Sequence, residues 1–418
     1  MRAGGRGGAP AVLVVATLAQ VAASLAQQGL IELVVYFRAL DHLSLVSMGL
    51  LAAAPPLGTM LGMTPAGAAV DRHGVGGTAL VGGVGMGLCI ALVYAFTPGP
   101  VALLALLLAA MGACAAVTPM AGAAAVLVAF PPERRATAMG VRQSGVTLGA
   151  ALGAALLPSL VAAWGLRDVI LALALPITVF GTALGRMTVG LGRPSPAAGV
   201  RSGASAAGGA GRLGLFAAVL PVAVAGALLA AGQYDTLAYA ITYLHDDAAL
   251  GLAAAGGVLA VAQVGGTLAR IGVGVLTDRL RWRTGAAVAL VAALGTAALV
   301  AFSLFPRAPL YVWAVRAFFL GMGAIGWNAL LLQWAAERVE EGARATAMGV
   351  AGTGVFLGAS VFPPLFGAVA TAAASLAQAW RSVALLYTLA LIIVAWMLAR
   401  ERARAQVSTP AAPQAARG

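Results

Sequence analysis

The chain has 418 residues, of which 61% are hydrophobic and only 9% are charged. Soluble proteins carry roughly a quarter of charged residues, so the composition excludes a water-soluble globular domain and indicates a chain that lies mostly in lipid. The net charge of +12 comes from 25 arginines and no lysine, a usage typical of a GC-rich bacterial genome. Because these arginines lie in short segments between apolar runs and form no basic face, we expect no nucleic acid partner.

Twelve apolar segments are long enough to cross the hydrocarbon core, which takes about 20 helical residues. Each must be a helix, because lipid offers no partners for unpaired backbone groups. The first segment is too long for the apolar part of a signal peptide, so we interpret it as a span. The predicted fold class is an all-α integral membrane protein with 12 transmembrane helices. We place them at residues 11–37, 43–70, 75–96, 101–130, 138–164, 168–190, 213–241, 249–276, 285–305, 309–336, 345–373 and 378–399.

A Pro-, Gly- and Ser-rich stretch divides these spans into two sets of six. Residues 191–212 (LGRPSPAAGVRSGASAAGGAGR) are typical of a flexible linker. The linker separates an N-terminal bundle, 1–190, from a C-terminal bundle, 213–399, and residues 400–418 form a polar tail. Eighteen of the 25 arginines then lie on the same side as the two termini, and four lie on the other side. Because basic loops mark the cytoplasmic side, we expect both termini in the cytoplasm and the chain in a bacterial inner membrane.

An internal repeat relates the two bundles. The segment Arg135–Val141 (RATAMGV) recurs letter for letter at Arg344–Val350, an offset of 209 residues. The segment Gly67–Arg72 has a counterpart at Gly274–Arg279, an offset of 207. The shared letters include Arg, Met and Asp, which are rarer in this chain than Ala and Gly, so chance matching explains the repeat poorly. Two parallel six-helix repeats are a known transporter architecture, with the substrate site near the midplane between them.

One of these repeated segments resembles a family signature. Gly67–Gly74 (GAAVDRHG) is similar to the motif that the major facilitator superfamily carries after its second span, although Val75 and Gly76 replace the basic residues that end the motif. The resemblance implies a secondary transporter that works by alternating access, and no enzyme. It also implies that this loop and its echo form a gate latch that holds the outward-facing state. We assign the gate to Gly67, Asp71, Arg72, Gly274, Asp278 and Arg279.

Ionisable residues inside the spans are candidates for function, because a charge in lipid is costly. Arg270, in the eighth span, could bind a carboxylate in bidentate fashion, and its surroundings resemble the anion carriers of the superfamily; otherwise it pairs with a buried acid. Asp235 is the candidate for proton coupling, or else a structural partner of Arg270. Glu32 is a second coupling candidate, or a local partner of Arg38. Arg142 could line the inner mouth of the substrate site or extend to the lipid headgroups.

Uncharged polar side chains complete the predicted substrate site. Gln28 corresponds to Asp235 under the 207-residue offset, so we expect the two to face one another across the repeat axis. Tyr239 lies one helical turn after Asp235. Asn328 and Gln263 could also hydrogen-bond a substrate, although such residues more often join helices.

The predicted function is proton-coupled transport of a small organic anion, in the first instance a carboxylate, by a monomer whose other partners are membrane lipids. The alternative is a proton-driven drug or metabolite efflux carrier, in which Asp235 would neutralise Arg270. The fifth span has Gly145 and Gly149 but lacks the proline and glycine pair of the family's drug antiporters, which weighs against that alternative. We expect no cofactor and no metal, because the histidines lie far apart and no phosphate-binding loop is present.

Overall fold

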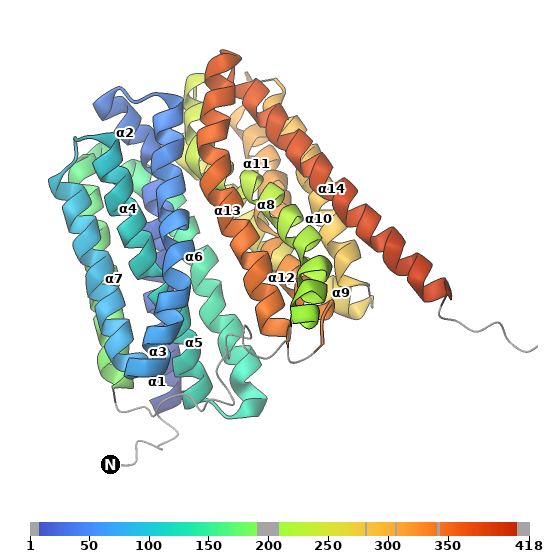
Figure 1. Ribbon diagram of the computed structural model, residues 1–418. Coiled ribbons are helices and arrows are strands. Elements are labelled where there is room, and N and C mark those ends of the chain that lie inside the picture. The colour runs from blue at the N-terminus through green and yellow to red at the C-terminus, as the bar shows by residue number, and fades with distance from the viewer. Residues whose placement is uncertain (1–7, 190–208, 281, 306, 341–342, 408–418) are drawn as a thin grey trace, which may run out of the picture.

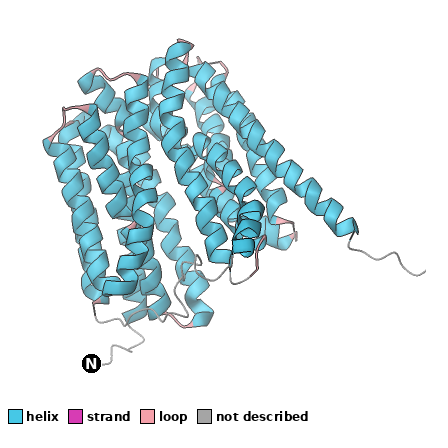
Figure 2. Ribbon diagram, viewed as in Figure 1, coloured by secondary structure: helices cyan, strands magenta, loops and turns pink. Residues whose placement is uncertain are grey.

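The computed structural model describes residues 8–189, 209–280, 282–305, 307–340 and 343–407. Within them every regular element is a helix (Figure 2), as lipid requires. The first seven helices are α1 (Gly8–Glu32), α2 (Val34–Asp41), α3 (Leu45–Ala95), α4 (Val101–Ala115), α5 (Val117–Ala129), α6 (Pro132–Trp164) and α7 (Leu166–Thr188). The next seven are α8 (Gly209–Asp246), α9 (Leu252–Arg279), α10 (Thr284–Ser303), α11 (Leu310–Ile325), α12 (Asn328–Glu337), α13 (Arg344–Ala372) and α14 (Leu376–Val407).

The described chain contains 12 stretches long and apolar enough to cross a membrane, which confirms the predicted fold class. The first, fourth and tenth spans each consist of two helices, α1 with α2, α4 with α5 and α11 with α12. The second and third spans together form α3 and meet at Gly74. The φ angle of 79° at Gly74 is a left-handed conformation that glycine adopts without strain. The last glycine of the signature motif therefore makes the turn between these spans.

The helices form two groups that lie against each other at one end (Figure 1). We call α1–α7 the N-terminal half and α8–α14 the C-terminal half; α3 contacts α13 across the boundary, and α6 contacts α9. At the end that carries α2, a Cβ on Gly49 would overlap the backbone of Pro363, and one on Gly256 would overlap Pro158. We call this the closed end. Towards the opposite end, where α1 begins, the two halves diverge (Figure 1).

The helices nearest the predicted linker and tail differ from expectation. Of the predicted linker, residues 191–208 lie outside the described residues, and α8 already begins at Gly209. The last helix continues to Val407, beyond residue 399 where we expected the bundle to end. The Arg, Glu and Ala residues of this extension are good helix formers.

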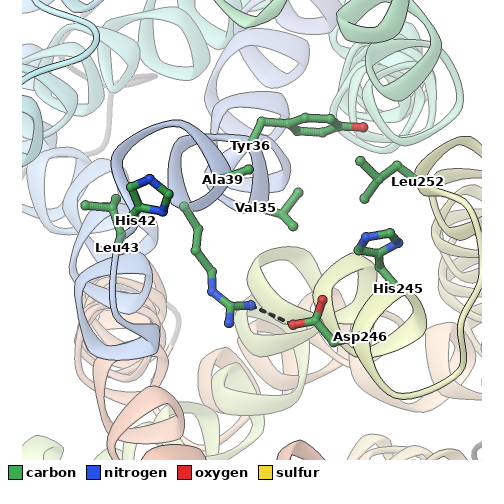
Figure 3. A pocket seen from close by; sticks show the side chains of 9 residues that line it. Val35, Tyr36, Ala39, His42, Leu43, His245, Asp246 and Leu252 are labelled. Carbon is green, nitrogen blue, oxygen red and sulfur yellow. Dashed lines mark hydrogen bonds and ion pairs between the residues drawn. The ribbon is translucent and has the colours of Figure 1, made fainter.

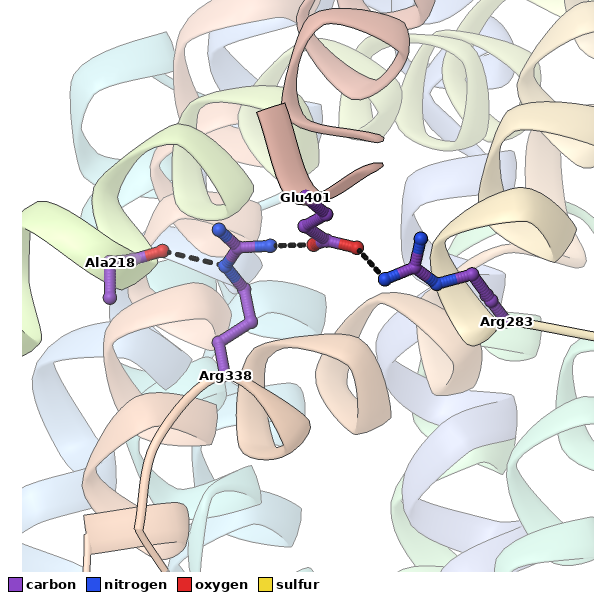
Figure 4. A network of polar contacts seen from close by, with 4 residues as sticks. All are labelled: Ala218, Arg283, Arg338 and Glu401. Atoms are coloured by element: carbon purple, nitrogen blue, oxygen red, sulfur yellow. Dashed lines mark hydrogen bonds and ion pairs between the residues drawn. The ribbon is translucent and has the colours of Figure 1, made fainter. Parts of the chain in front are cut away.

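A polar network anchors that extension to the C-terminal half (Figure 4). Glu401 of α14 pairs with Arg338 and lies 3.1 Å from Arg283. The Nε of Arg338 also donates to the backbone oxygen of Ala218, 2.9 Å away on α8. The network therefore joins α8, the end of α12, the start of α10 and α14, which explains why the helix outlasts the span.

The fourth and tenth spans are interrupted at equivalent places. The first break lies at Ala116, between α4 and α5, and the second at Gly326 and Trp327, between α11 and α12. Ala116 and Gly326 are 210 residues apart (326 − 116), close to the offset of the repeat. An interrupted helix leaves carbonyl oxygens without their usual donors, so other groups must satisfy them.

Candidate functional site

Arg270 projects from α9 to the break in the tenth span. Its Nε donates to the backbone oxygen of Ile325, the last residue of α11, at 3.0 Å. The guanidinium lies within electrostatic reach of Tyr234. No carboxylate of the described chain lies within ion-pair distance of Arg270, so the alternative of an internal ion pair is wrong for this structure. The partly exposed Arg270 can therefore offer its terminal nitrogens to a carboxylate.

Asp235 lies inside α8 with a side chain that is 1% exposed, and neither of its carboxylate oxygens has a hydrogen-bond partner. The hydroxyls of Tyr239 and Tyr387 are in electrostatic reach of it. The structural pairing with Arg270 that we considered is not formed. A buried, unpaired carboxyl within a span is costly and is typical of a proton relay.

Glu32 is the last residue of α1, at the point where the first span is interrupted. It is buried, and both carboxylate oxygens lack partners. Its Oε2 lies against α6, where a Cβ on Gly153 would be 2.9 Å away. Arg38 pairs with Asp246 instead of Glu32, so the predicted local pair is wrong.

Arg142 is buried inside the N-terminal half. Its terminal nitrogens donate to the side-chain oxygens of Gln20, at 2.8 Å, and Gln143, at 3.1 Å, and its Nε has no partner. The side chain is only 4% exposed, so it does not extend to the lipid headgroups. Its polar partners hold the guanidinium within the bundle.

Gln20 belongs to a polar row on α1 that sequence reasoning did not assign, apart from Gln28. Gln28 donates to the hydroxyl of Ser24 at 2.6 Å, and Gln27 donates to the hydroxyl of Thr59 at 2.6 Å. The spacing of Gln20, Ser24, Gln27 and Gln28 is i, i+4, i+7 and i+8, which places them on one helix face. This helical periodicity is the sequence signal from which the polar row could have been predicted.

The other predicted substrate contacts have different surroundings. The hydroxyl of Tyr239 lies 2.7 Å from the backbone oxygen of Leu45 and 2.8 Å from that of Pro363. Leu45 is in the N-terminal half, so Tyr239 joins the halves at the closed end and its hydroxyl is already occupied. Gln263 is buried with its Nε2 unpartnered, and Asn328 is half-buried at the start of α12.

The gate motif lies at the end where the halves diverge. Among the described residues, and apart from the helix's own backbone and the chain neighbours, no heavy atom lies within 4 Å of the place where a Cβ on Gly67 or Gly274 would stand. Neither glycine is therefore at a close helix contact in this conformation, because the halves are apart at this end. The remaining motif residues are two arginines with exposed side chains, Arg72 and Arg279, and two aspartates whose side chains lie outside the described residues, Asp71 and Asp278.

A cavity of about 410 Å³ lies at the closed end, between α2 and α8 (Figure 3). Arg38 of α2 and Asp246 of α8 form an ion pair of 2.6 Å at its wall, which joins the two halves. His42 and His245 also line the cavity. Burial, followed by the charge of Asp246, raises the pKa of the adjacent Asp247. Within the described residues no group of three metal-ligating side chains occurs.

Solved structures share this architecture. A bacterial homologue of the human lysosomal transporter Spinster, in an inward-facing and occupied conformation, has a TM-score of 0.74 at 15% identity, covering 94% of this chain and 97% of that one. Its unoccupied form gives 0.73 at 16% identity, with 93% and 97% covered. The nucleoside transporter NupG gives 0.70 at 14% identity, with 92% and 98% covered. These likenesses show the fold.

Relatives in sequence agree with the fold. Two Mycobacterium tuberculosis proteins described as uncharacterized MFS-type transporters, MT3072 of strain CDC 1551 / Oshkosh and Rv2994 of strain H37Rv, are each 29% identical over 327 residues. The match covers 78% of this chain and 71% of each relative. The sequence model of the family described as "Major Facilitator Superfamily" matches residues 16–363 of this chain. This multi-pass chain belongs to the major facilitator superfamily, a family of membrane transporters and not of enzymes.

Proposed function

We propose that this transporter moves a small organic anion, in the first instance a carboxylate, together with protons across the cytoplasmic membrane of a bacterium. The observation that carries the proposal is Arg270, a partly exposed guanidinium inside a span with no carboxylate partner among the described residues. An unpaired cation inside a span costs free energy, which an anionic ligand would offset. The forked guanidinium group has the geometry to bind a carboxylate through two hydrogen bonds. The carrier would work as a monomer of two bundles, 1–190 and 213–399, joined by the linker 191–212.

Alternating access gives the two ends of the molecule their roles. Under the predicted topology both termini are cytoplasmic, so the closed end faces outwards and the diverging end faces inwards. The conformation would then be inward-facing. Within the described part of the chain, no other element closely contacts Gly67 or Gly274, which suits a latch that engages only in the opposite state.

Proton coupling is assigned to Asp235, with Glu32 as the second candidate. Both carboxyls are buried in the spans and lack hydrogen-bond partners. The efflux alternative requires Asp235 to neutralise Arg270, and the two are not paired. The unpaired charges therefore favour anion transport.

Uptake into proteoliposomes tests the substrate class. Acetate, lactate, pyruvate and succinate are supplied with and without an inside-alkaline pH gradient, and we expect the gradient to drive accumulation of at least one. Arg270→Gln should lower its initial uptake rate at least about tenfold, because hydrogen bonds to charged groups contribute about 1.5–3 kcal/mol. Arg316→Gln is the matched control, since Arg316 also donates to a backbone oxygen, that of Leu304 at 2.6 Å, but lies at the closed end. Uptake at full rate in Arg270→Gln would overturn the anion site.

A further inference from the structure

The break in the tenth span is held by side chains from two neighbouring helices and from the break itself. Arg270 donates to the oxygen of Ile325 at 3.0 Å, and the indole nitrogen of Trp327 donates to the oxygen of Ala324 at 2.7 Å. The hydroxyl of Tyr387, on α14, lies 3.5 Å from the same Ala324 oxygen and within hydrogen-bonding reach of Trp327. Arg270, the residue proposed to bind the anion, and the buried Tyr387 therefore both lie at the same irregular stretch of backbone.

Tyr387 is also fixed against the helix that carries Asp235. Its hydroxyl donates to the backbone oxygen of Leu229 on α8 at 2.8 Å. The ring fills a notch between two glycines: a Cβ on Gly232 would stand 2.6 Å from Cε2, and one on Gly295 would stand 2.5 Å from Cε1. Gly232 precedes Asp235 by one helical turn, and Tyr387 is fully buried. The hydroxyl thus contacts the helix that carries Asp235, within electrostatic reach of that carboxyl, and also lies near the helix break.

We propose that Tyr387 is a positioning residue that transmits the protonation state of Asp235 to the break in the tenth span, where Arg270 is anchored. Its hydroxyl donates to the Leu229 oxygen and lies in electrostatic reach of Asp235, so ionisation of that carboxyl changes the field at the hydroxyl and, through it, the contacts with Ala324 and Trp327. The inference rests on the part of the proposed function that makes Asp235 the coupling residue. It explains how a proton and an anion bound at separate groups can influence each other without an ion pair between them.

Other charged and titratable groups near Asp235 do not offer this connection. Tyr239 is in electrostatic reach of Asp235, but its hydroxyl contacts Leu45 and Pro363 at the closed end. Arg270 of α9 donates to Ile325 and lies in electrostatic reach of Tyr234, and no contact of it with Asp235 is described. Glu32 of α1 lies against α6. Among the residues for which contacts are described, Tyr387 alone lies in electrostatic reach of Asp235 and also near the break.

Hydrogen–deuterium exchange in nanodiscs tests the connection without any substrate. The readout is protection of the amides of residues 322–328 at acidic and alkaline pH, corrected for the intrinsic exchange rate. Wild type should show a pH-dependent difference that Asp235→Asn abolishes. Tyr387→Phe should reduce the difference about fivefold, the factor that one net hydrogen bond contributes. Tyr243→Phe is the matched control, because Tyr243 is equally buried but its hydroxyl has no partner.

The outcomes separate the two ideas. A pH response that survives Asp235→Asn overturns the connection from Asp235 to the break, and with it the role of Tyr387. The proposed function fails separately, if Arg270→Gln takes up the substrate at full rate. A response that Asp235→Asn abolishes but Tyr387→Phe leaves at wild-type size overturns only the role of Tyr387. Equal loss in Tyr243→Phe, or no pH response in wild type, also overturns it. Should Tyr387→Phe fold poorly, Trp327→Phe removes the donor to Ala324 and should reduce the response in the same way.

Discussion

The two halves of this transporter share a sequence repeat but treat their buried polar groups differently. In the N-terminal half the polar row on α1 is internally bonded: Gln20 accepts from Arg142, and Gln27 donates to Thr59. The exceptions in this half are Glu32, the hydroxyl of Tyr36 and the Nε of Arg142. In the C-terminal half, five buried side chains of α8 and α9 each keep at least one polar atom without a partner, namely Gln233, Asp235, Thr242, Tyr243 and Gln263.

This difference shows that a symmetric scaffold can carry asymmetric chemistry. Each unsatisfied buried polar group costs about 1–3 kcal/mol, so a half that keeps several of them gives up stability. In the N-terminal half, polar residues hydrogen-bond to one another and hold helices together. The C-terminal half exposes Arg270 and leaves Asp235 unpaired, which we interpret as the recognition and coupling side of the carrier.

The largest expected effect comes from replacing the two unpaired carboxyl groups, Asp235 and Glu32, by amides. Asp235→Asn should abolish accumulation driven by an inside-alkaline gradient, because an amide cannot carry the proton, while exchange of internal for external substrate continues. Glu32→Gln should retain accumulation. The measurement is the ratio of internal to external labelled lactate or succinate in proteoliposomes. The reverse pattern would move coupling to the N-terminal half.

Arg142 gives a second, smaller test. Arg142→Gln removes the donor to Gln20, so we expect unfolding in detergent to become easier by about 1–3 kcal/mol. Uptake per folded carrier should stay within about twofold of wild type, well below the effect of a lost charged hydrogen bond to the ligand. Unchanged stability together with lost uptake would instead place Arg142 in the substrate site.

The smallest expected effect concerns the ion pair that joins the halves. Arg38 and Asp246 are each about one third exposed, and exposed pairs contribute roughly 0–1 kcal/mol. Arg38→Gln should therefore raise the reactivity of a reporter cysteine at the closed end by no more than about fivefold. Added salt should raise the reactivity of the same cysteine in the wild-type protein, because it screens the ion pair. Asp246→Asn should give the same shift, and the double variant no more. Additive shifts would show that the two charges act separately.

Much of the fold could be predicted from the sequence, because lipid imposes it. The spans follow from apolar length alone, and the repeat at Arg135 and Arg344 identifies the paired fifth and eleventh spans. The end of α14 could not be placed this way, since apolar length does not report the ion pairs of Glu401.

The candidate site was less predictable, because its charged side chains bind to backbone groups or to residues that are distant in the sequence. Arg270 bonds to the backbone oxygen of Ile325, which no side-chain pattern reveals. Arg38 pairs with Asp246, 208 residues away, rather than with the nearby Glu32. That spacing equals the repeat offset to within one residue, so the repeat contained the information although local spacing pointed elsewhere.

The close glycine contacts at the closed end have a consequence for the medium in which the carrier works. Gly49 meets the backbone of Pro363, and Gly256 meets Pro158, so this seal is made by shape and not by charge. Dissolved ions weaken attractions between exposed charges over about 8 Å at physiological ionic strength, but they have nothing to screen between uncharged groups in contact. These contacts should hold equally well in fresh water and in brine, so the Arg38–Asp246 pair is the described contact between the halves at this end that would sense salinity.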